Sequence, residues 1–261
     1  MDIPKQVDYH SLKDRVVIIT GGGQGIGRTY AHHFAAQGAV PVIAEIKPDD
    51  GARVAAEIEA DGGRVLFVET DVGDLASAEA MAAAALSAHG RIDGLINNAA
   101  MFTNISNAPF CEIPVDEWLR TIHVNVTGAY FCARAVAPAM REAKWGRMVN
   151  ISSGVTTIGY PNFLHYVTSK SAVIGMTRSL ARELGPDNIT VNTFWPGLTR
   201  TEVSEMAGKT SARYERQIEL QCLKREGTTD DLARIVLFLC SEESGWINGH
   251  NIAGDGGYKF L

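Results

Sequence analysis

The 261-residue sequence is poor in the residue patterns that build metal centres and disulfide frameworks. It has four cysteines, none of them in a C-x-x-C motif, and its seven histidines form no H-E-x-x-H motif. A zinc site, a redox-active dithiol and a catalytic metal are therefore not expected. We expect all four cysteines to be reduced thiols that pack inside the protein; they are Cys111, Cys132, Cys222 and Cys240.

Basic residues are also in deficit, with 24 Lys and Arg against 30 Asp and Glu and a net charge of −6. Nucleic acids and anionic membranes bind clustered Lys and Arg, so a small-molecule partner fits this composition better. No apolar run approaches the ~20 residues that span a bilayer. The segment from Met1 to Lys5 lacks the basic-then-apolar pattern of a signal peptide. We expect a cytoplasmic protein.

What the sequence does contain is a regular alternation of short apolar segments and longer segments with helical periodicity. This is the rhythm of repeated βαβ units. The predicted strands span residues 16–20, 40–45, 64–68, 93–97, 147–152, 190–194 and 251–253. The predicted helices lie near residues 26–37, 50–60, 75–89, 115–142, 165–184 and 230–240.

The first predicted strand is apolar without alternation, as in a parallel sheet with helices on both faces. No linker-like tract or repeat divides the chain. We predict one α/β domain over residues 1–261, a Rossmann-like doubly wound sheet of about seven parallel strands.

A glycine-rich loop, Thr20–Gly27, follows the first predicted strand and leads into a helix with the spacing G-x-x-x-G-x-G. Glycines let the backbone turn sharply and approach a ligand, and the N-terminus of a helix favours a phosphate. The alternative is a tight strand-to-helix turn without a ligand. The placement favours a pyrophosphate site whose candidate contacts are Gly21, Gln24, Gly25, Ile26 and Gly27.

Glu45 stands at the end of the second predicted strand, eighteen positions after Gly27. A carboxylate there can accept hydrogen bonds from both hydroxyls of an adenosine ribose and would repel a 2′-phosphate. NAD is therefore favoured over NADP, although the basic residues Arg28 and Lys47 are near in sequence. The alternative for Glu45 is a solvated charge at a strand end.

Tyr166 and Lys170 are four residues apart, and Ser153 lies thirteen residues before Tyr166. On a helix, this spacing places the phenol and the ammonium on one face. A tyrosine normally titrates near pH ~10. Because a nearby positive charge lowers the pKa of a phenol, the pair predicts a proton-transfer site that works near neutral pH.

Further short motifs occur between and after these residues. In chain order, the set is Thr20-Gly21-x-x-x-Gly25-x-Gly27, Asp71-Val72, Asn97-Asn98-Ala99-Ala100, Asn125 within His123-Val124-Asn125-Val126, Ser153, Tyr166-x-x-x-Lys170 and Pro196-Gly197-Leu198-Thr199. With this order and spacing, the sequence resembles the short-chain dehydrogenase/reductase family over nearly its whole length. It departs from the family at Ala100, where glycine is usual, and at Trp195, where small residues are common.

The resemblance implies a role for each catalytic candidate. Tyr166 would be the general acid/base that exchanges a proton with the substrate oxygen while hydride passes between the same carbon and a nicotinamide. Lys170 would bind the nicotinamide ribose and lower the pKa of Tyr166, and Ser153 would hold the substrate oxygen. Asn125 would hold a water that links Lys170 to solvent; the alternative is a structural Asn at a helix kink.

The resemblance also implies a cofactor-binding set at the carboxyl ends of the strands. Beside the glycine loop and Glu45, the set contains Asp71 and Val72 near the adenine, Asn98 and Ala99 near the adenosine ribose, and Pro196, Gly197 and Thr199 near the nicotinamide, with Tyr166 and Lys170. Two alternatives stay open. Asp71 could instead be a carboxylate in the N-terminal region of the helix, before Leu75, and Asn97 could tie neighbouring strands together.

The substrate is less well defined. Residues 200–229 are polar and weakly periodic, which suits an active-site lid. Near the catalytic motifs, an apolar pocket is predicted from Phe102, Val155, Tyr160, Phe163, His165, Trp195 and Leu198, together with Ser153 and Tyr166, although single aromatics are often core residues. We expect a hydrophobic secondary alcohol or ketone, aromatic or alicyclic. His165 should point away from Tyr166 on the helix.

The family usually forms tetramers through its two long helices, and apolar stripes on the helices predicted near 115–142 and 165–184 suit such contacts. Examples are Ala129, Ala133, Ala137, Val167 and Ile174, with further contacts from Tyr258 to Leu261. We expect a homotetrameric NAD-dependent secondary-alcohol dehydrogenase. An NADPH-dependent carbonyl reductase and a nucleotide sensor without turnover are the alternatives; Glu45 argues against the first, and the intact Ser153, Tyr166 and Lys170 argue against the second.

Overall fold

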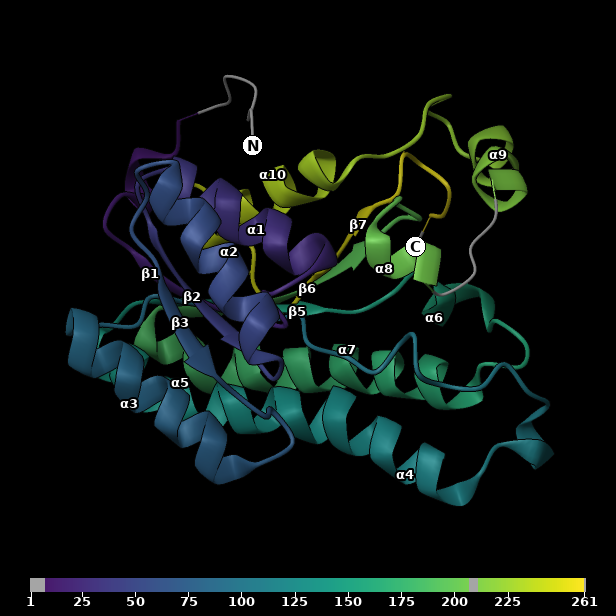
Figure 1. The fold of residues 1–261 in the computed structure, drawn as a ribbon, viewed down its shortest axis with the longest axis horizontal. Coiled ribbons are helices and arrows are strands. Elements are labelled where there is room, and N and C mark those ends of the chain that lie inside the picture. The colour runs from purple at the N-terminus through teal and green to yellow at the C-terminus, as the bar shows by residue number, and fades with distance from the viewer. Residues whose placement is uncertain (1–7, 207–210, 261) are drawn as a thin grey trace.

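One seven-stranded parallel sheet forms the centre of the computed structural model, which describes residues 8–206 and 211–260 (Figure 1). The strand order is β3-β2-β1-β4-β5-β6-β7. The strands are β1 Val16–Thr20, β2 Val40–Glu45, β3 Leu66–Glu69, β4 Gly94–Asn97, β5 Gly146–Ile151, β6 Ile189–Pro196 and β7 Asn251–Gly254. The segment Met1 to Lys5, part of the expected lid and Leu261 lie outside the described residues.

Strand ends are decided by pairing between neighbouring strands, and this explains where the predicted bounds are off. The predicted strand at 64–68 begins only at Leu66, where pairing with Val42 begins. The strand predicted at 190–194 extends to Pro196, because Trp195 and Pro196 pair with Ala253 and Gly254 of β7. Such register information lies in another part of the chain.

Helices cover both faces of the sheet, as predicted. On one side, α1 (Gly25–Ala36), α2 (Pro48–Ala60) and α10 (Thr229–Cys240) pack on an apolar cluster with β1 and β2 side chains. On the other side, α3 (Leu75–His89), α5 (Gly128–Ala143) and α7 (Leu164–Leu184) pack on a second cluster (Figure 1). The shorter helices are α4 Val115–Ile122, α6 Val155–Ile158, α8 Glu202–Met206 and α9 Ser211–Leu220.

The single helix predicted over 115–142 is wrong in one respect. Between α4 and α5, residues His123–Thr127 form a π-helical turn, and Asn125 lies within it. A π turn inserts an extra residue into an α-helix and is frequent at functional sites. Here the side chain of Asn125 bonds to Met101 and Ser169, so tertiary contacts hold the irregular turn.

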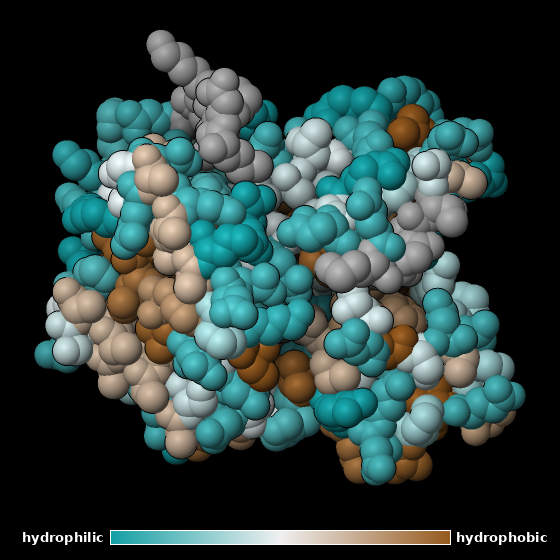
Figure 2. Space-filling model, viewed as in Figure 1, coloured by the Kyte–Doolittle hydropathy of each residue, from teal (hydrophilic) through white to brown (hydrophobic). Residues whose placement is uncertain are grey.

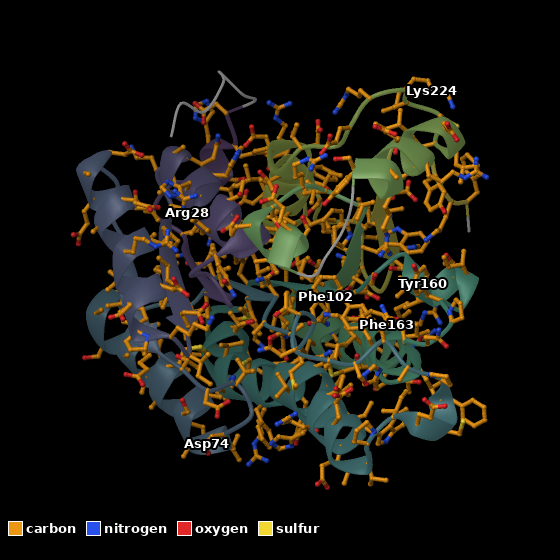
Figure 3. The ribbon with its side chains drawn as sticks, turned by 45° about the vertical axis from the view of Figure 1, so that its right-hand side comes forward. Arg28, Asp74, Phe102, Tyr160, Phe163 and Lys224 are labelled. Carbon is orange, nitrogen blue, oxygen red and sulfur yellow. The ribbon has the colours of Figure 1, made fainter. Side chains whose placement is uncertain are left out.

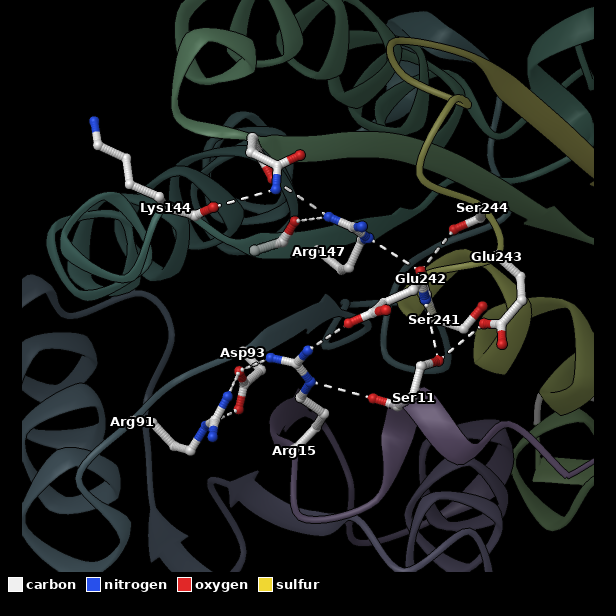
Figure 4. Close-up of polar contacts among 12 residues, drawn as sticks. Ser11, Arg15, Arg91, Asp93, Lys144, Arg147, Ser241, Glu242, Glu243 and Ser244 are labelled. Atoms are coloured by element: carbon white, nitrogen blue, oxygen red, sulfur yellow. Dashed lines mark hydrogen bonds and ion pairs between the residues drawn. The ribbon is translucent and has the colours of Figure 1, made fainter.

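A polar cluster ties the amino ends of the strands together (Figure 4). Asp93, before β4, accepts hydrogen bonds from Val16 N at 2.8 Å and from Arg15 Nη1 at 2.9 Å. Arg15 also pairs with Glu242, after α10, at 2.9 Å. The buried Arg147 guanidinium donates to Ser241 O at 3.1 Å, and burial lowers its pKa. These bonds occupy one end of the sheet, opposite the glycine loop.

Among the described residues, no helix is both long and apolar enough to cross a membrane, and no group of three or more His, Cys, Asp or Glu side chains could hold a metal. Cys132 and Cys240 are buried in the two apolar clusters, as expected, and burial raises the pKa of each to about 12. Cys111 and Cys222 are exposed, so the expectation that all four pack inside is wrong for these two.

Candidate active site

The glycine loop between β1 and α1 has the backbone geometry that only glycine adopts easily. Gly21 and Gly25 have φ angles of 64° and 57°, in the left-handed region. A Cβ atom on Gly27 would lie 2.2 Å from the Gly21 carbonyl oxygen. The loop is therefore folded tightly against the first turn of α1, and its spacing has a steric cause.

Thr20 and Asn98 fix this loop to the neighbouring strand β4. The Thr20 hydroxyl accepts hydrogen bonds from the backbone N of Asn98 and of Ala99, both at 3.0 Å. The Asn98 amide donates to Thr20 O at 3.0 Å and to Gly21 O at 3.1 Å. The strand order reverses between β1 and β4, and open parallel sheets bind ligands at such a crevice. The sequence did not predict that the Thr20 hydroxyl holds the loop to β4, although Thr20 is the first residue of the recognised motif.

Glu45 is 5% exposed at the end of β2. Its carboxylate accepts hydrogen bonds from Gly23 N at 3.1 Å and Lys47 N at 3.2 Å. The alternative of a solvated strand-end charge is therefore wrong. Arg28 does not approach Glu45 as a partner; its Nε donates to Glu57 at 2.7 Å. The negative charge beside the glycine loop is thus held by two backbone N–H groups.

A second carboxylate reaches the same loop from far along the chain. Gly25 N, at the first turn of α1, donates to Glu202 Oε1 at 2.8 Å. Glu202 belongs to α8, in the segment predicted as a lid. An anionic oxygen thus already lies at the N-terminus of α1, where free N–H groups and the helix dipole favour negative charge. No sequence signal connects two residues 177 positions apart.

Ser153, Tyr166 and Lys170 come together as predicted. Tyr166 and Lys170 lie on one face of α7, with Lys170 Nζ 5.8 Å from the centre of the Tyr166 ring. Ser153 follows β5, and its side chain hydrogen-bonds to Tyr166. Lys170 Nζ donates to Ile151 O at 2.8 Å, and the Ser152 hydroxyl donates to Lys170 O at 2.8 Å. The end of β5 therefore holds Lys170 at two points, its ammonium and its backbone carbonyl.

The acidity of Tyr166 differs from the prediction. Burial raises its pKa above the ordinary value, and the hydrogen bond with Ser153 only partly opposes this. Burial also lowers the pKa of Lys170 to about 8. The expectation that the ammonium lowers the Tyr166 pKa is wrong for this geometry, because the removal of both groups from water dominates. The protein alone therefore holds Tyr166 in its protonated form.

Asn125 and Asn97 both make side-chain bonds that shape the site. Asn125 Oδ1 accepts from Met101 N at 2.7 Å, and its Nδ2 donates to Ser169 Oγ at 3.0 Å, next to Lys170. Asn97 Nδ2 donates to Asn150 Oδ1 at 2.8 Å. Asn97 thus ties β4 to β5 through its amide, and the structural alternative predicted for it is confirmed.

The remaining cofactor candidates lie at the carboxyl end of the sheet. Asp71 follows β3; its Oδ1 accepts from Gly73 N at 2.8 Å and its backbone N donates to Ser77 Oγ of α3 at 3.0 Å, while the cap of α3 is Asp74. Val72 is largely buried and packs against Gly128. Thr199 is 7% exposed and donates to Gly197 O at 3.3 Å.

Aromatic rings contact the ring of Tyr166, and they come from residues predicted to line the substrate pocket. The rings of Phe163 and Phe102 lie 4.9 Å and 5.3 Å from the Tyr166 ring, and Tyr160 lies 6.3 Å from Phe163 (Figure 3). The surface is hollowed between the part that carries α1 and α2 and the α8–α9 segment (Figure 2). Val155 and Leu198 are half-buried, beside Gly154 and Gly197.

Two predicted pocket residues are core residues instead. Trp195 is 1% exposed, because it lies inside β6 and pairs with β7. His165 is fully buried, with Nε2 2.9 Å from Glu117 Oε1. Glu117 also accepts hydrogen bonds from Ser106 N and Oγ at 2.9 Å and 2.6 Å. This network joins the start of α7 to the loop that carries Phe102.

Comparisons with known proteins agree with this geometry. A family model described as enoyl-(acyl carrier protein) reductase matches residues 21–259. Trans-4-hydroxycyclohexanecarboxylate dehydrogenase of Sinomonas cyclohexanicum is 37% identical over 252 residues, covering 94% of this chain and 93% of the relative. The chain is a short-chain dehydrogenase/reductase.

This short-chain dehydrogenase/reductase has further relatives in sequence and structure. L-rhamnose 1-dehydrogenase (NAD(P)(+)) of Azotobacter vinelandii is 35% identical, with 94% of this chain and 97% of the relative covered. A solved short-chain type dehydrogenase/reductase from Mycobacterium ulcerans superposes with a TM-score of 0.90 at 30% identity, over 95% of this chain and 90% of that one. The enzyme is thus an NAD(P)-dependent oxidoreductase that acts on CH–OH groups.

The residues of this dehydrogenase/reductase fit a dinucleotide. A Cβ on Gly23 would lie 2.8 Å from the Glu45 side chain, so only glycine at this position lets the Glu45 carboxylate approach the loop. The Glu202 carboxylate oxygen at Gly25 N stands in for a phosphate oxygen at the helix N-terminus. Glu45 lies beside this point with a buried negative charge suited to ribose hydroxyls.

Proposed function

We propose that this enzyme is an NAD-dependent dehydrogenase that interconverts a hydrophobic secondary alcohol, alicyclic or aromatic, and its ketone. The observation that carries the proposal is the setting of Tyr166: its hydroxyl is bonded to Ser153, and its ring lies beside the Lys170 ammonium and the rings of Phe102 and Phe163. A proton-transfer group inside an aromatic wall suits a substrate with an apolar body and one reacting hydroxyl. The alicyclic hydroxy acid in the name of the Sinomonas relative supports this class.

The protein's own residues handle the proton and the substrate oxygen. In oxidation, Tyr166 first releases its own proton along the path through Lys170; Ser153 then donates a hydrogen bond to the substrate oxygen and the Tyr166 phenolate accepts the hydroxyl proton. In reduction, Tyr166, which burial holds protonated, donates the proton to the carbonyl oxygen. A bound nicotinamide dinucleotide supplies or accepts the hydride. Lys170 binds the nicotinamide ribose, and Asn125 supports a proton path from Lys170 because its amide bonds Ser169, the neighbouring residue.

The choice of NAD rests on Glu45. Its buried carboxylate lies beside the glycine loop, and a 2′-phosphate there would bring a second negative charge against it. The basic side chains near the loop are already paired: Arg28 with Glu57, Lys47 with Asp50, and Arg53, whose Nη2 donates to Gly23 O at 2.8 Å, with Asp50 and Glu57. The remaining proposed contacts are Gly21, Gln24, Gly25, Ile26, Gly27, Asp71, Val72, Asn98, Ala99, Pro196, Gly197 and Thr199.

The assembly is proposed to be a homotetramer. Apolar side chains stand exposed on α4, where Val115 is 70% and Leu119 is 58% exposed, and at the start of α7, where Leu164 is 43% exposed. Brown atoms gather at the lower right of Figure 2, where Figure 1 places α4. The residues named from the sequence are partly wrong: Ala129 and Ala133 of α5 are buried within the chain, and Ala133 belongs to the apolar core.

Activity with a panel of cyclic and aryl secondary alcohols, followed by nicotinamide absorbance, tests the proposed function. Tyr166→Phe is the matched variant, because it removes the proton carrier and keeps the ring contacts with Phe102 and Phe163. We expect turnover to fall at least about 100-fold, with NAD affinity within a few-fold of the wild type. A variant that keeps most of its activity removes Tyr166 from the mechanism, and a wild type inactive on the whole panel overturns the substrate class.

A further inference from the structure

The C-terminal tail, which follows β7 from Asp255, brings a lysine against the catalytic loop, the segment after β5 that carries Ser153 and Gly154. Lys259 Nζ donates a hydrogen bond to Gly154 O at 2.5 Å. Gly154 is the residue after Ser153, and a Cβ on Gly154 would lie only 2.9 Å from this ammonium. Because consecutive Cα atoms are ~3.8 Å apart, the ammonium lies on the order of 5–8 Å from the hydroxyl that holds the substrate oxygen.

The tail is built to hold Lys259 in this place. Asp255 accepts hydrogen bonds from the backbone N of Gly257, Tyr258 and Lys259, at 3.0, 3.2 and 3.0 Å. Gly197 N donates to Gly254 O at 2.8 Å, so the tail begins directly on the proposed nicotinamide side of the site. The sequence-based expectation was that this segment makes contacts between subunits; within one chain it turns back onto the catalytic loop.

Lys259 carries a positive charge without a close counter-ion. Among residues 8–206 and 211–260, no carboxylate lies within ion-pair distance of its ammonium. Burial lowers the pKa of Lys259, and Asp255 opposes this only from a distance. Its hydrogen bond to a carbonyl oxygen uses one of the three ammonium protons. Two N–H groups are therefore available for a further acceptor.

A second cation, on the lid, lies beside the aromatic rings that lead to Tyr166. Arg213, on α9, lies 5.1 Å from the Tyr160 ring, and Tyr160 is the outer ring of the row that leads through Phe163 to Tyr166. Within the described part of the chain, Arg213 forms no ion pair with a carboxylate. Two cations without a carboxylate partner, one at the Ser153–Gly154 loop and one at Tyr160, favour an anionic ligand in a chain of net charge −6.

We propose that Lys259 is the specificity-determining residue that binds a carboxylate of the substrate, so the preferred substrates are secondary alcohols that also carry a carboxylate group. This rests on the proposed function and narrows its substrate class. The separation between the Lys259 ammonium and Ser153 suits a carboxylate set one ring away from the reacting carbon. The aromatic rings contact the apolar body between the two polar ends.

The test compares 4-hydroxycyclohexanecarboxylate with its methyl ester, which differs mainly in charge. We expect the wild type to have a KM for the acid at least about 10-fold below that for the ester. Lys259→Gln keeps a donor for Gly154 O and removes the charge, so it should raise the KM for the acid about 10- to 100-fold and leave the ester within a few-fold. Lys259→Arg should keep the preference for the acid.

Equal effects of Lys259→Gln on acid and ester would mean that Lys259 only anchors the tail, and the proposal would be overturned. A wild type that does not discriminate between them would overturn it as well. If the wild type turns over neither compound, the proposed function has failed for this class. A binding experiment then tests the role of Lys259 separately, by fluorescence titration with cyclohexanecarboxylate in the presence of NAD. This acid should bind the wild type and Lys259→Arg at least about 10-fold more tightly than Lys259→Gln. Equal binding to all three proteins would overturn the proposal.

Discussion

Lys170 is an ammonium group buried inside the protein, and its position costs stability. Its pKa is lowered from 10.5 to about 8 by burial. Below pH 8 the group is charged in both the folded and the unfolded chain, so the folded state bears the full penalty. Between pH 8 and 10.5 the folded state releases the proton, and the penalty falls as pH rises.

Lys170→Met should therefore stabilise the fold at neutral pH while abolishing turnover. The shift corresponds to about 3 kcal/mol at pH 7, less about 1 kcal/mol for the lost hydrogen bond to Ile151 O. The gain over the wild type should shrink from pH 7 to pH 10.5. Urea unfolding at several pH values measures it, with the exposed Lys13→Met as control. A pH-independent difference would mean that Lys170 is not a penalised buried charge.

Glu45 is predicted to decide between the two dinucleotides. Glu45→Gln keeps an oxygen that can accept from Gly23 N and removes the charge. We expect NAD affinity to fall about 10-fold, since hydrogen bonds to a charged group are the stronger ones. NADP affinity should rise, because repulsion of the 2′-phosphate is removed. Separate titrations with NAD and NADP by intrinsic fluorescence measure both; unchanged ratios would rule out the ribose-hydroxyl role.

At the residue scale, spacing predicts the catalytic group but not its acidity. Tyr166 and Lys170 are one helical turn apart, so their shared face follows from local periodicity. The pKa of Tyr166 depends on how completely other segments of the chain bury it, among them the segments that carry Phe102 and Phe163. Glu45 was predictable for the same reason as Tyr166, because it ends a strand whose bounds are local.

At the element scale, the contact between α8 and α1 places a carboxylate where a phosphate should bind. Glu202 Oε1 accepts from Gly25 N at 2.8 Å, and Val203 would lie 2.9 Å from a Cβ on Gly25. A dinucleotide whose pyrophosphate takes this N–H must displace the Glu202 carboxylate. The short helix α8 therefore competes with the cofactor for the N-terminus of α1.

Glu202→Gln should strengthen NAD binding by about two- to five-fold, because it removes a negative charge from the helix N-terminus. The gain should be largest at low ionic strength, where screening is weakest. Fluorescence titrations at two salt concentrations measure it. Glu205→Gln, on the same helix but without a bond to the loop, is the matched control. Weaker NAD binding by Glu202→Gln would show that this carboxylate supports the cofactor site.

Elements differ in how far the sequence predicts them. The strands at 16–20 and 40–45 match β1 and β2, because both are continuous apolar runs with clear ends. The break between α4 and α5 was not predicted, since the π turn at Asn125 is held by Met101 and Ser169 rather than by local propensity.

At the scale of the whole molecule, contacts across long stretches of sequence complete the site. The tail reaches Gly154 across 105 residues, and α8 reaches Gly25 across 177. Neither contact leaves a periodic or compositional signal, so both were invisible before the fold was known. The doubly wound sheet was predictable because every βαβ unit repeats one local pattern.

The exposed apolar face of α4 carries the prediction for the assembly. Leu119 is 58% exposed and Val115, one turn away, is 70% exposed, although α4 packs against α7. Clustered apolar side chains on a helix that is otherwise packed indicate a surface covered by another subunit. Leu119→Asp should therefore convert the proposed tetramer to dimers or monomers in analytical ultracentrifugation, because it would bury an unpaired charge in the proposed interface. Leu86→Asp, at a 38% exposed leucine of α3, is the control and should leave the assembly intact. A Leu119→Asp protein that sediments like the wild type would place the subunit interface elsewhere.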